Sequence, residues 1–142
     1  MTPTRFGWSA EDVYLVASRA HSLFDQGLTH QAAALFEGLV AVDPANLYCR
    51  HALAAVYLSL GVPRLAVDQL SAALAHSPYD AETLARRCEA LVAVGEMARA
   101  EADLAALRRS GGAGQIARLE ARLAVARRGN HTPQLPNHQS DN

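Results

Sequence analysis

The sequence predicts an all-α protein, a right-handed superhelical array of three helical hairpins closed by a C-terminal capping helix. Three observations support this prediction. Glycines recur at a spacing of 34 residues, at Gly27, Gly61 and Gly95. An alanine follows each glycine by five residues, at Ala32, Ala66 and Ala100. Two prolines keep the same period, at Pro44 and Pro78. A fixed period of this length is typical of stacked helix–turn–helix units whose first helices line a concave surface.

The first unit follows a short lead, residues 1–9, which we expect to be loose. Ser9, with Asp12 three residues later, can cap a helix over 10–25. Gly27 then permits a tight turn. A second helix over about 30–42 ends before Pro44, because proline disfavours the helical conformation at the residue that precedes it.

The other units repeat this plan. The second is expected to form helices over 46–60 and 63–76, with Pro63 in a favourable first-turn position. Asp80 can cap the third, whose helices are expected over 81–94 and 96–109. Glycines at 111, 112 and 114 predict a flexible joint before a capping helix over 115–128. The tail, 129–142, has no apolar period and is expected to be disordered.

These elements predict one domain over 10–128, with repeats at about 13–46, 47–80 and 81–114. A spacing of 34 residues is that of the tetratricopeptide repeat. Three arginines depart from its pattern of apolar packing positions. Arg19 and Arg87 stand where a large aliphatic residue is usual, and Arg50 stands where tryptophan is common. We expect their stems to cover apolar surface while their charged ends reach water.

Composition and motifs exclude several classes of function. The net charge of −1 makes nucleic acid an unexpected partner. No apolar run is long enough for membrane insertion, and residues 1–10 lack the apolar core of a signal peptide, so a cytoplasmic location is expected. The two cysteines form no CxxC motif. No nucleophile motif or phosphate-binding loop is present, so we expect no enzyme activity, no cofactor and no metal.

The inner face of the array is the expected binding surface. Steps of three and four residues along the first helices select side chains that share that face. The candidate peptide-binding residues are Tyr14, Ala17, His21, Phe24, Tyr48, His51, Ala52, Ala55, Leu58, Arg86 and Glu89. In the first two units they form an aromatic trough, and in the third they are charged. An alternative is that the aromatic rings only pack between helices. His21 and His51 can face one another, but no third metal ligand is evident.

Two stretches of the chain resemble a branch of the tetratricopeptide family. They are Phe36-Glu37-Gly38-Leu39 through Asp43, and Cys88-Glu89-Ala90-Leu91 through Gly95-Glu96-Met97 to Ala100-Glu101-Ala102. Both are similar to the class II chaperones of bacterial type III secretion. The resemblance implies a chaperone that holds an extended apolar segment of a hydrophobic translocator protein in its concave groove before export. It would make Tyr14, Phe24, Tyr48, His51 and Leu58 the groove contacts.

Other interpretations stay open at this point. The chain could be the co-chaperone of the secretion needle subunit, which would hold a helix, or a scaffold in the assembly of another complex. A homodimer is also open, because the N-terminal lead is shorter than in the resembling family. The Pro133–Pro136 stretch of the tail could occupy the groove, although a disordered end is the simpler interpretation. A clamp for acidic C-termini is excluded, since only Arg86 of its five expected positions (Ala17, His21, Ala52, Glu82, Arg86) fits.

Overall fold

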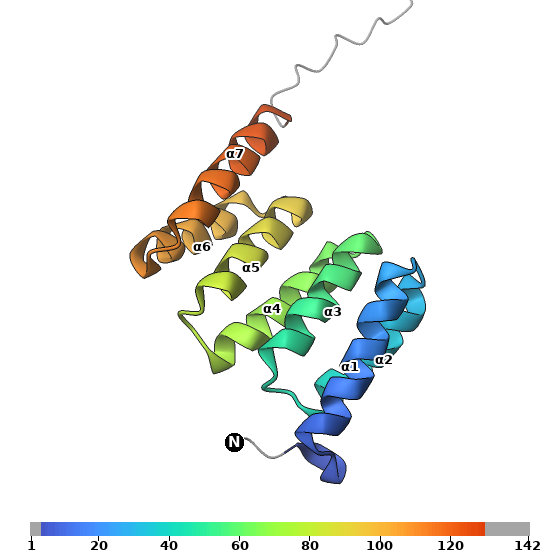
Figure 1. Ribbon diagram of the computed structural model, residues 1–142. Coiled ribbons are helices and arrows are strands. Elements are labelled where there is room, and N and C mark those ends of the chain that lie inside the picture. Colours follow the sequence, from blue (N-terminus) through green and yellow to red (C-terminus); the bar gives the residue numbers. More distant parts are fainter. Residues whose placement is uncertain (1–3, 130–142) are drawn as a thin grey trace, which may run out of the picture.

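The computed structural model describes residues 4–129, and these residues form helices and turns only (Figure 1). One turn of 3-10 helix, η1, covers Arg5–Gly7. The α-helices are α1 (Ala10–Asp25), α2 (Thr29–Val42), α3 (Leu47–Ser59), α4 (Pro63–His76), α5 (Ala81–Val94), α6 (Met97–Ser110) and α7 (Ala113–Gly129). None of the helices in this described part of the chain combines the length and the apolarity needed to cross a bilayer.

The helices are stacked as consecutive hairpins. Each helix packs against the next one along the chain, and α1, α3 and α5 also contact one another in turn (Figure 1). The last helix, α7, lies against both α5 and α6. This arrangement confirms the predicted all-α array of three hairpins and a closing helix.

The glycine turns have the geometry that their period predicts. Gly27, Gly61 and Gly95 have φ angles of 79°, 75° and 90°, a left-handed conformation that other L-residues avoid. Three helices, α1, α4 and α5, have the predicted bounds, and α2, α3 and α6 differ by one residue at their ends. The Ser9–Asp12 capping box is present at the start of α1. The repeated local signals therefore specify where each hairpin turns.

Two connecting segments differ from the prediction. The joint predicted over residues 110–114 is shorter than expected, because α6 continues to Ser110, Gly111 makes a left-handed turn with φ of 86°, and α7 begins at Ala113. The lead is not wholly loose. It contains η1, which contacts α2, and Trp8 packs against the core. The predicted tail, including Pro133–Pro136, lies outside the described residues apart from Gly129.

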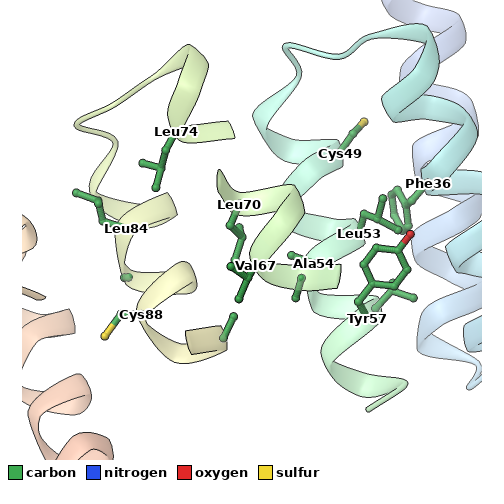
Figure 2. Packing of buried hydrophobic residues seen from close by; sticks show 14 of the residues in the cluster. Phe36, Cys49, Leu53, Ala54, Tyr57, Val67, Leu70, Leu74, Leu84 and Cys88 are labelled. Carbon is green, nitrogen blue, oxygen red and sulfur yellow. The ribbon is translucent and has the colours of Figure 1, made fainter. Parts of the chain in front are cut away.

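One apolar core runs through all three hairpins (Figure 2). Large side chains such as Phe36, Leu53 and Leu70 are almost completely buried within it. Small side chains lie where helices approach closely, and these include Ala20, Ala32, Ala66, Cys88 and Ala100, each with no exposed surface. Tight packing of this kind holds α1, α3 and α5 at fixed positions and so shapes the surface that they share.

The three arginines that depart from the repeat pattern have different surroundings in the structure. Arg19 is exposed, as expected. The charged end of Arg87 pairs with the buried carboxylate of Asp103 on α6. Arg50 donates to the carbonyl oxygen of Pro44 and to the side chain of Gln69. Both arginines are only partly exposed, and polar partners on neighbouring elements bind their guanidinium groups, which the expectation of charged ends in water did not include.

Candidate functional site

A pocket of about 430 Å³ opens between the first helices of the three hairpins. It is lined by His21, Phe24, Phe36, Leu47, Tyr48, His51, Ala52, Ala55, Asp80, Glu82 and Arg86. Most of these residues lie on α1, α3 and the first turns of α5. Phe36, on α2, is fully buried and forms part of an apolar floor. The polar side chains come from His21, His51 and the start of the third unit.

Most of the candidate binding residues come together at this pocket. It is lined by His21, Phe24, Tyr48, His51, Ala52, Ala55 and Arg86 from the predicted set. They share one region because residues three and four apart lie on the same helix face, and the 34-residue period places equivalent faces side by side. Their role in binding stays a prediction.

The remaining candidates do not line the pocket. Ala17 is buried, and Leu58 is half-buried against the core. Tyr14 is 69% exposed on α1 but does not belong to the lining. Glu89 lies close to two arginines of α7, 3.9 Å from Arg118 and 4.0 Å from Arg122. The capping helix therefore covers part of the α5 face that was expected to extend the groove.

Four lining residues were not among the candidate peptide-binding residues, namely Phe36, Leu47, Asp80 and Glu82. On sequence alone, Phe36 stands out only within a stretch that resembles the chaperone family, and Asp80 is expected only to cap a helix. Leu47 is the first residue of α3. Asp80 does cap α5, since its carboxylate accepts the backbone N–H of Thr83. Asp80 caps a helix that lines the groove, and this position was the sequence signal that its side chain could also face the site.

His51 is held by a chain of hydrogen bonds that joins the second and third units. Its Nε2 atom lies 2.7 Å from Oγ1 of Thr83, and that hydroxyl donates to Oδ2 of Asp80 over 2.6 Å. The same carboxylate oxygen accepts the backbone N–H of Thr83 at 2.9 Å. Thr83 is fully buried and His51 is 8% exposed. The ring is therefore fixed in place at the wall of the pocket.

The surroundings of this chain shift two pKa values. Burial lowers the pKa of His51 below its ordinary 6.5, and the charge of Arg86 lowers it further, while Glu82 and Asp80 oppose the shift. The hydrogen bond from the Thr83 hydroxyl is the main cause that lowers the pKa of Asp80. At neutral pH the site therefore contains a neutral imidazole and an ionised Asp80 carboxylate.

The two charged residues at the other side of the pocket neutralise one another. Arg86 donates from Nε and Nη2 to the same Oε1 atom of Glu82, at 3.1 and 2.8 Å. This pair leaves the pocket with an apolar floor, small side chains at Ala52 and Ala55, and the ring of Tyr48, which is 54% exposed. Such a surface can accept an apolar side chain and the backbone of an extended segment.

The described residues contain no group of three or more His, Cys, Asp or Glu side chains arranged to hold a metal ion. His21 lies 3.6 Å from Asp25 on the outer part of α1, and His51 is bound to Thr83. Both histidines line the same pocket, but each one has a partner of its own.

Comparison with known proteins identifies the fold. No protein-family profile matches the chain, and no curated protein matches it in sequence. Among solved structures, PcrH from Pseudomonas aeruginosa is 19% identical with a TM-score of 0.75, over 85% of this chain and 96% of PcrH. The type III secretion chaperone SycD of Yersinia enterocolitica, in complex with a peptide of the translocator YopD, is 19% identical with a TM-score of 0.74, over 86% and 97%.

A protein with a different partner has the same architecture. The first TPR of Spaghetti (RPAP3), bound to the HSP90 peptide SRMEEVD, is 17% identical with a TM-score of 0.70, over 82% of this chain and 96% of that one. The chain therefore has the tetratricopeptide fold, which translocator chaperones of type III secretion share with other peptide-binding arrays.

Proposed function

We propose that this protein is a cytoplasmic chaperone that holds an extended apolar segment of a type III secretion translocator in its concave groove before export. One observation carries the proposal. The first helices of all three hairpins converge on a pocket with an apolar floor, and Tyr48 exposes more than half of its side chain above it. An exposed aromatic ring beside small alanines is suited to cover apolar side chains of an unfolded client.

The solved complexes of similar fold support this choice of client. SycD has been solved with a peptide of the translocator YopD, and its array aligns with most of this chain. A bound segment in a groove lined by first helices would use the face that here carries Tyr48, Ala52 and Ala55. A protein partner, bound as a peptide segment, is the kind of ligand that this face favours.

The charges of the pocket disfavour the other known mode of peptide capture. SRMEEVD, the peptide bound to RPAP3, is acidic. In this chain Arg86, the one position that matches a clamp for a terminal carboxylate, is already paired with Glu82. An incoming carboxylate would have to displace Glu82 and then lie beside it, which costs electrostatic energy. A neutral, apolar segment meets no such repulsion.

Two alternatives use the same array. A needle-subunit co-chaperone would hold an amphipathic helix, and a scaffold would bind a folded partner. A crosslink map distinguishes these from a translocator chaperone. Crosslinks from the Tyr48 region to an extended apolar segment support the proposal, crosslinks to one face of a helix support the needle co-chaperone, and crosslinks spread over the outer helices support a scaffold.

The proposal is tested with an array of short overlapping peptides that covers the proteins encoded beside this chain's gene. We expect peptides from an apolar stretch to bind, and Tyr48→Glu to abolish their binding because it places an unpaired charge over the apolar floor. Tyr79→Glu is the matched control. Tyr79 is 84% exposed in the loop between α4 and α5 and is not part of the pocket lining, so this variant should bind normally.

Leu58, which we also predicted as a contact, is a poor position for this test. It packs against the core, so a Glu substitution there would lower stability and confuse loss of folding with loss of binding. Equal binding by the Tyr48→Glu and Tyr79→Glu proteins would show that the client does not use this pocket. Helical content, measured by circular dichroism, should be the same for both variants.

A further inference from the structure

The imidazole of His51 presents one unpaired nitrogen to the pocket. The residue is more than nine-tenths buried, and Nε2 is bound to Thr83. Among the described residues no hydrogen bond reaches Nδ1. In the same residues, every side-chain nitrogen or oxygen that is sealed from solvent has a hydrogen-bond partner. Nδ1 therefore keeps an accessible surface, and the space that His51 borders is the pocket. A polar atom in that position is available to a bound molecule.

The neighbouring hydrogen bonds determine which ring nitrogen carries the proton. The hydroxyl of Thr83 has a single hydrogen, and the ionised carboxylate of Asp80, 2.6 Å away, can only accept it. The oxygen of Thr83 must therefore accept a hydrogen bond from Nε2–H of His51. In the neutral ring this leaves Nδ1 as an acceptor.

We infer that His51 fixes how the backbone of an extended segment lies in the groove. Its Nδ1 atom accepts a hydrogen bond from a backbone N–H of the bound extended segment, and Asp80 and Thr83 are positioning residues that hold the ring in the accepting tautomer. This inference rests on the proposed function. It adds a directional contact to a surface that otherwise recognises its client by apolar burial.

The small side chains beside His51 favour a backbone donor. Ala55 lies one helical turn after His51 on the same face of α3, and Ala52 is adjacent, so neither projects beyond its Cβ atom. The main chain of an extended segment can therefore come close to α3 at this point. Such a segment offers an N–H group at every residue except proline, whereas a side-chain donor would have to enter from above the helix.

Charged and titratable groups from several elements face His51, and they determine how binding depends on pH. His21 comes from α1, Tyr48 from α3 itself, and Asp80, Glu82 and Arg86 from the start of the third unit. The only lining residue from α2 is Phe36, which is apolar, and no residue of α4 lines the pocket. Burial lowers the pKa of His51 below 6.5. Affinity should therefore be constant above pH 6.5 and fall at lower pH, as Nδ1 gains a proton and ceases to accept.

The first experiment measures fluorescence anisotropy of the tightest-binding peptide from the array, as a function of pH. His51→Phe should weaken binding at pH 7.5 by at least about fivefold, because a buried N–H of the peptide loses its acceptor, and should remove the dependence on pH. His30→Phe is the control. It changes an exposed histidine on α2 that does not line the pocket, and it should keep the pH profile of the wild-type protein.

The positioning residues are tested with a conservative pair. Thr83→Val keeps the shape of the side chain but removes the hydroxyl, so the ring is no longer held in one tautomer. Its imidazole nitrogen NMR signals should shift toward a mixture of tautomers, and its affinity should fall. Thr83→Ser keeps the hydroxyl and should restore both. If the NMR signals show that Nδ1 carries the proton in the wild-type protein at pH 7.5, the inference fails. This measurement requires no peptide.

The second experiment identifies the donor. Replacing peptide bonds by esters, one at a time, removes single N–H groups from the probe peptide. One ester should weaken binding to the wild-type protein severalfold and have no effect on His51→Phe, which is the result expected of a direct contact. If only a side-chain substitution in the peptide behaves in this way, the backbone assignment is wrong. If the wild-type protein and His51→Phe bind the peptides equally well, the inference fails and the proposed function stands. If no peptide binds to the wild-type protein, both fail.

Discussion

The guanidinium of Arg87 on α5 donates two hydrogen bonds to the carboxylate of Asp103 on α6, 2.8 Å from Nε to Oδ2 and 2.6 Å from Nη2 to Oδ1. Asp103 is buried, and the Arg87 side chain is 22% exposed. The pairing with Asp103 raises the pKa of Arg87 above its ordinary value, although burial opposes the shift. This pair replaces an aliphatic contact inside the third hairpin.

Arg87→Met should lower the free energy of unfolding by about 3 kcal/mol, because the Asp103 carboxylate is left buried without its cation. Replacing both residues by leucine should restore most of the loss, since two apolar side chains can pack where the pair was. Urea unfolding followed by circular dichroism measures both effects.

Arg86→Met provides the comparison on the same helix. Arg86 pairs with Glu82 at a more exposed position, where such a pair contributes only about 0.5 kcal/mol. A Met variant at 87 that is no less stable than the one at 86 would contradict a structural role for the Arg87–Asp103 pair.

Substitution of alanine for glycine should have opposite effects at two positions. Gly95→Ala should destabilise the protein by about 1 kcal/mol, because φ is 90° there, although an added Cβ meets no atom within 4 Å. Gly38→Ala, inside α2, also meets no atom within 4 Å and should stabilise the protein by up to about 1 kcal/mol. Thermal unfolding of the two variants gives the sign of each change in stability. Changes of equal sign would contradict the assigned backbone conformations.

The small residues of the repeat should resist enlargement. Ala100→Leu should lower the free energy of unfolding by about 1–3 kcal/mol, because Ala100 has no exposed surface and lies among packed helices. Ala98→Leu, on the exposed side of the same helix, should change stability by no more than about 0.5 kcal/mol. Chemical denaturation distinguishes the two variants, and similar costs would show that the helices adjust freely at this crossing.

The thiols of Cys49 and Cys88 should react slowly in the folded protein. Both are fully buried, and desolvation raises their pKa values from 9.0 to about 11. Thiolate is the reactive form, so labelling with iodoacetamide should be slow at pH 8 and become fast only when the protein unfolds. Rapid labelling without denaturant would contradict the burial of either residue.

The same shifts predict a loss of stability at high pH. Because the unfolded thiols ionise near pH 9.0 and the folded ones near 11, the unfolded state binds fewer protons in this range. The free energy of unfolding should therefore be unaffected by these groups below pH 9 and should fall as the pH rises toward 11. Replacing both cysteines by alanine should remove this contribution.

The repeat could be predicted from sequence because its signals are local. Gly27, Gly61 and Gly95 each mark a turn, and a helix begins and ends at a cap or a proline that lies within a few residues. The side chains that share a helix face also follow from helical periodicity, which is why His51, Ala52 and Ala55 were correctly grouped together.

Contacts between helices could not be predicted in the same way. The approach of α7 to Glu89 depends on how one helix lies across another, and nothing in the residues near Glu89 indicates it. The Arg87–Asp103 pair and the His51–Thr83 bond join residues 16 and 32 positions apart. Such pairs depend on how helices pack within and between hairpins, which the period implies but does not describe atom by atom.

Most of the pocket lining comes from α1, α3 and the start of α5, and this has a consequence for cooperativity. In a stacked array each hairpin is stabilised mainly by its immediate neighbours, so the ends can open while the middle stays intact. A molecule seated against all three hairpins links the first to the third directly. Occupancy would therefore convert a chain of separable units into one that melts in a single step.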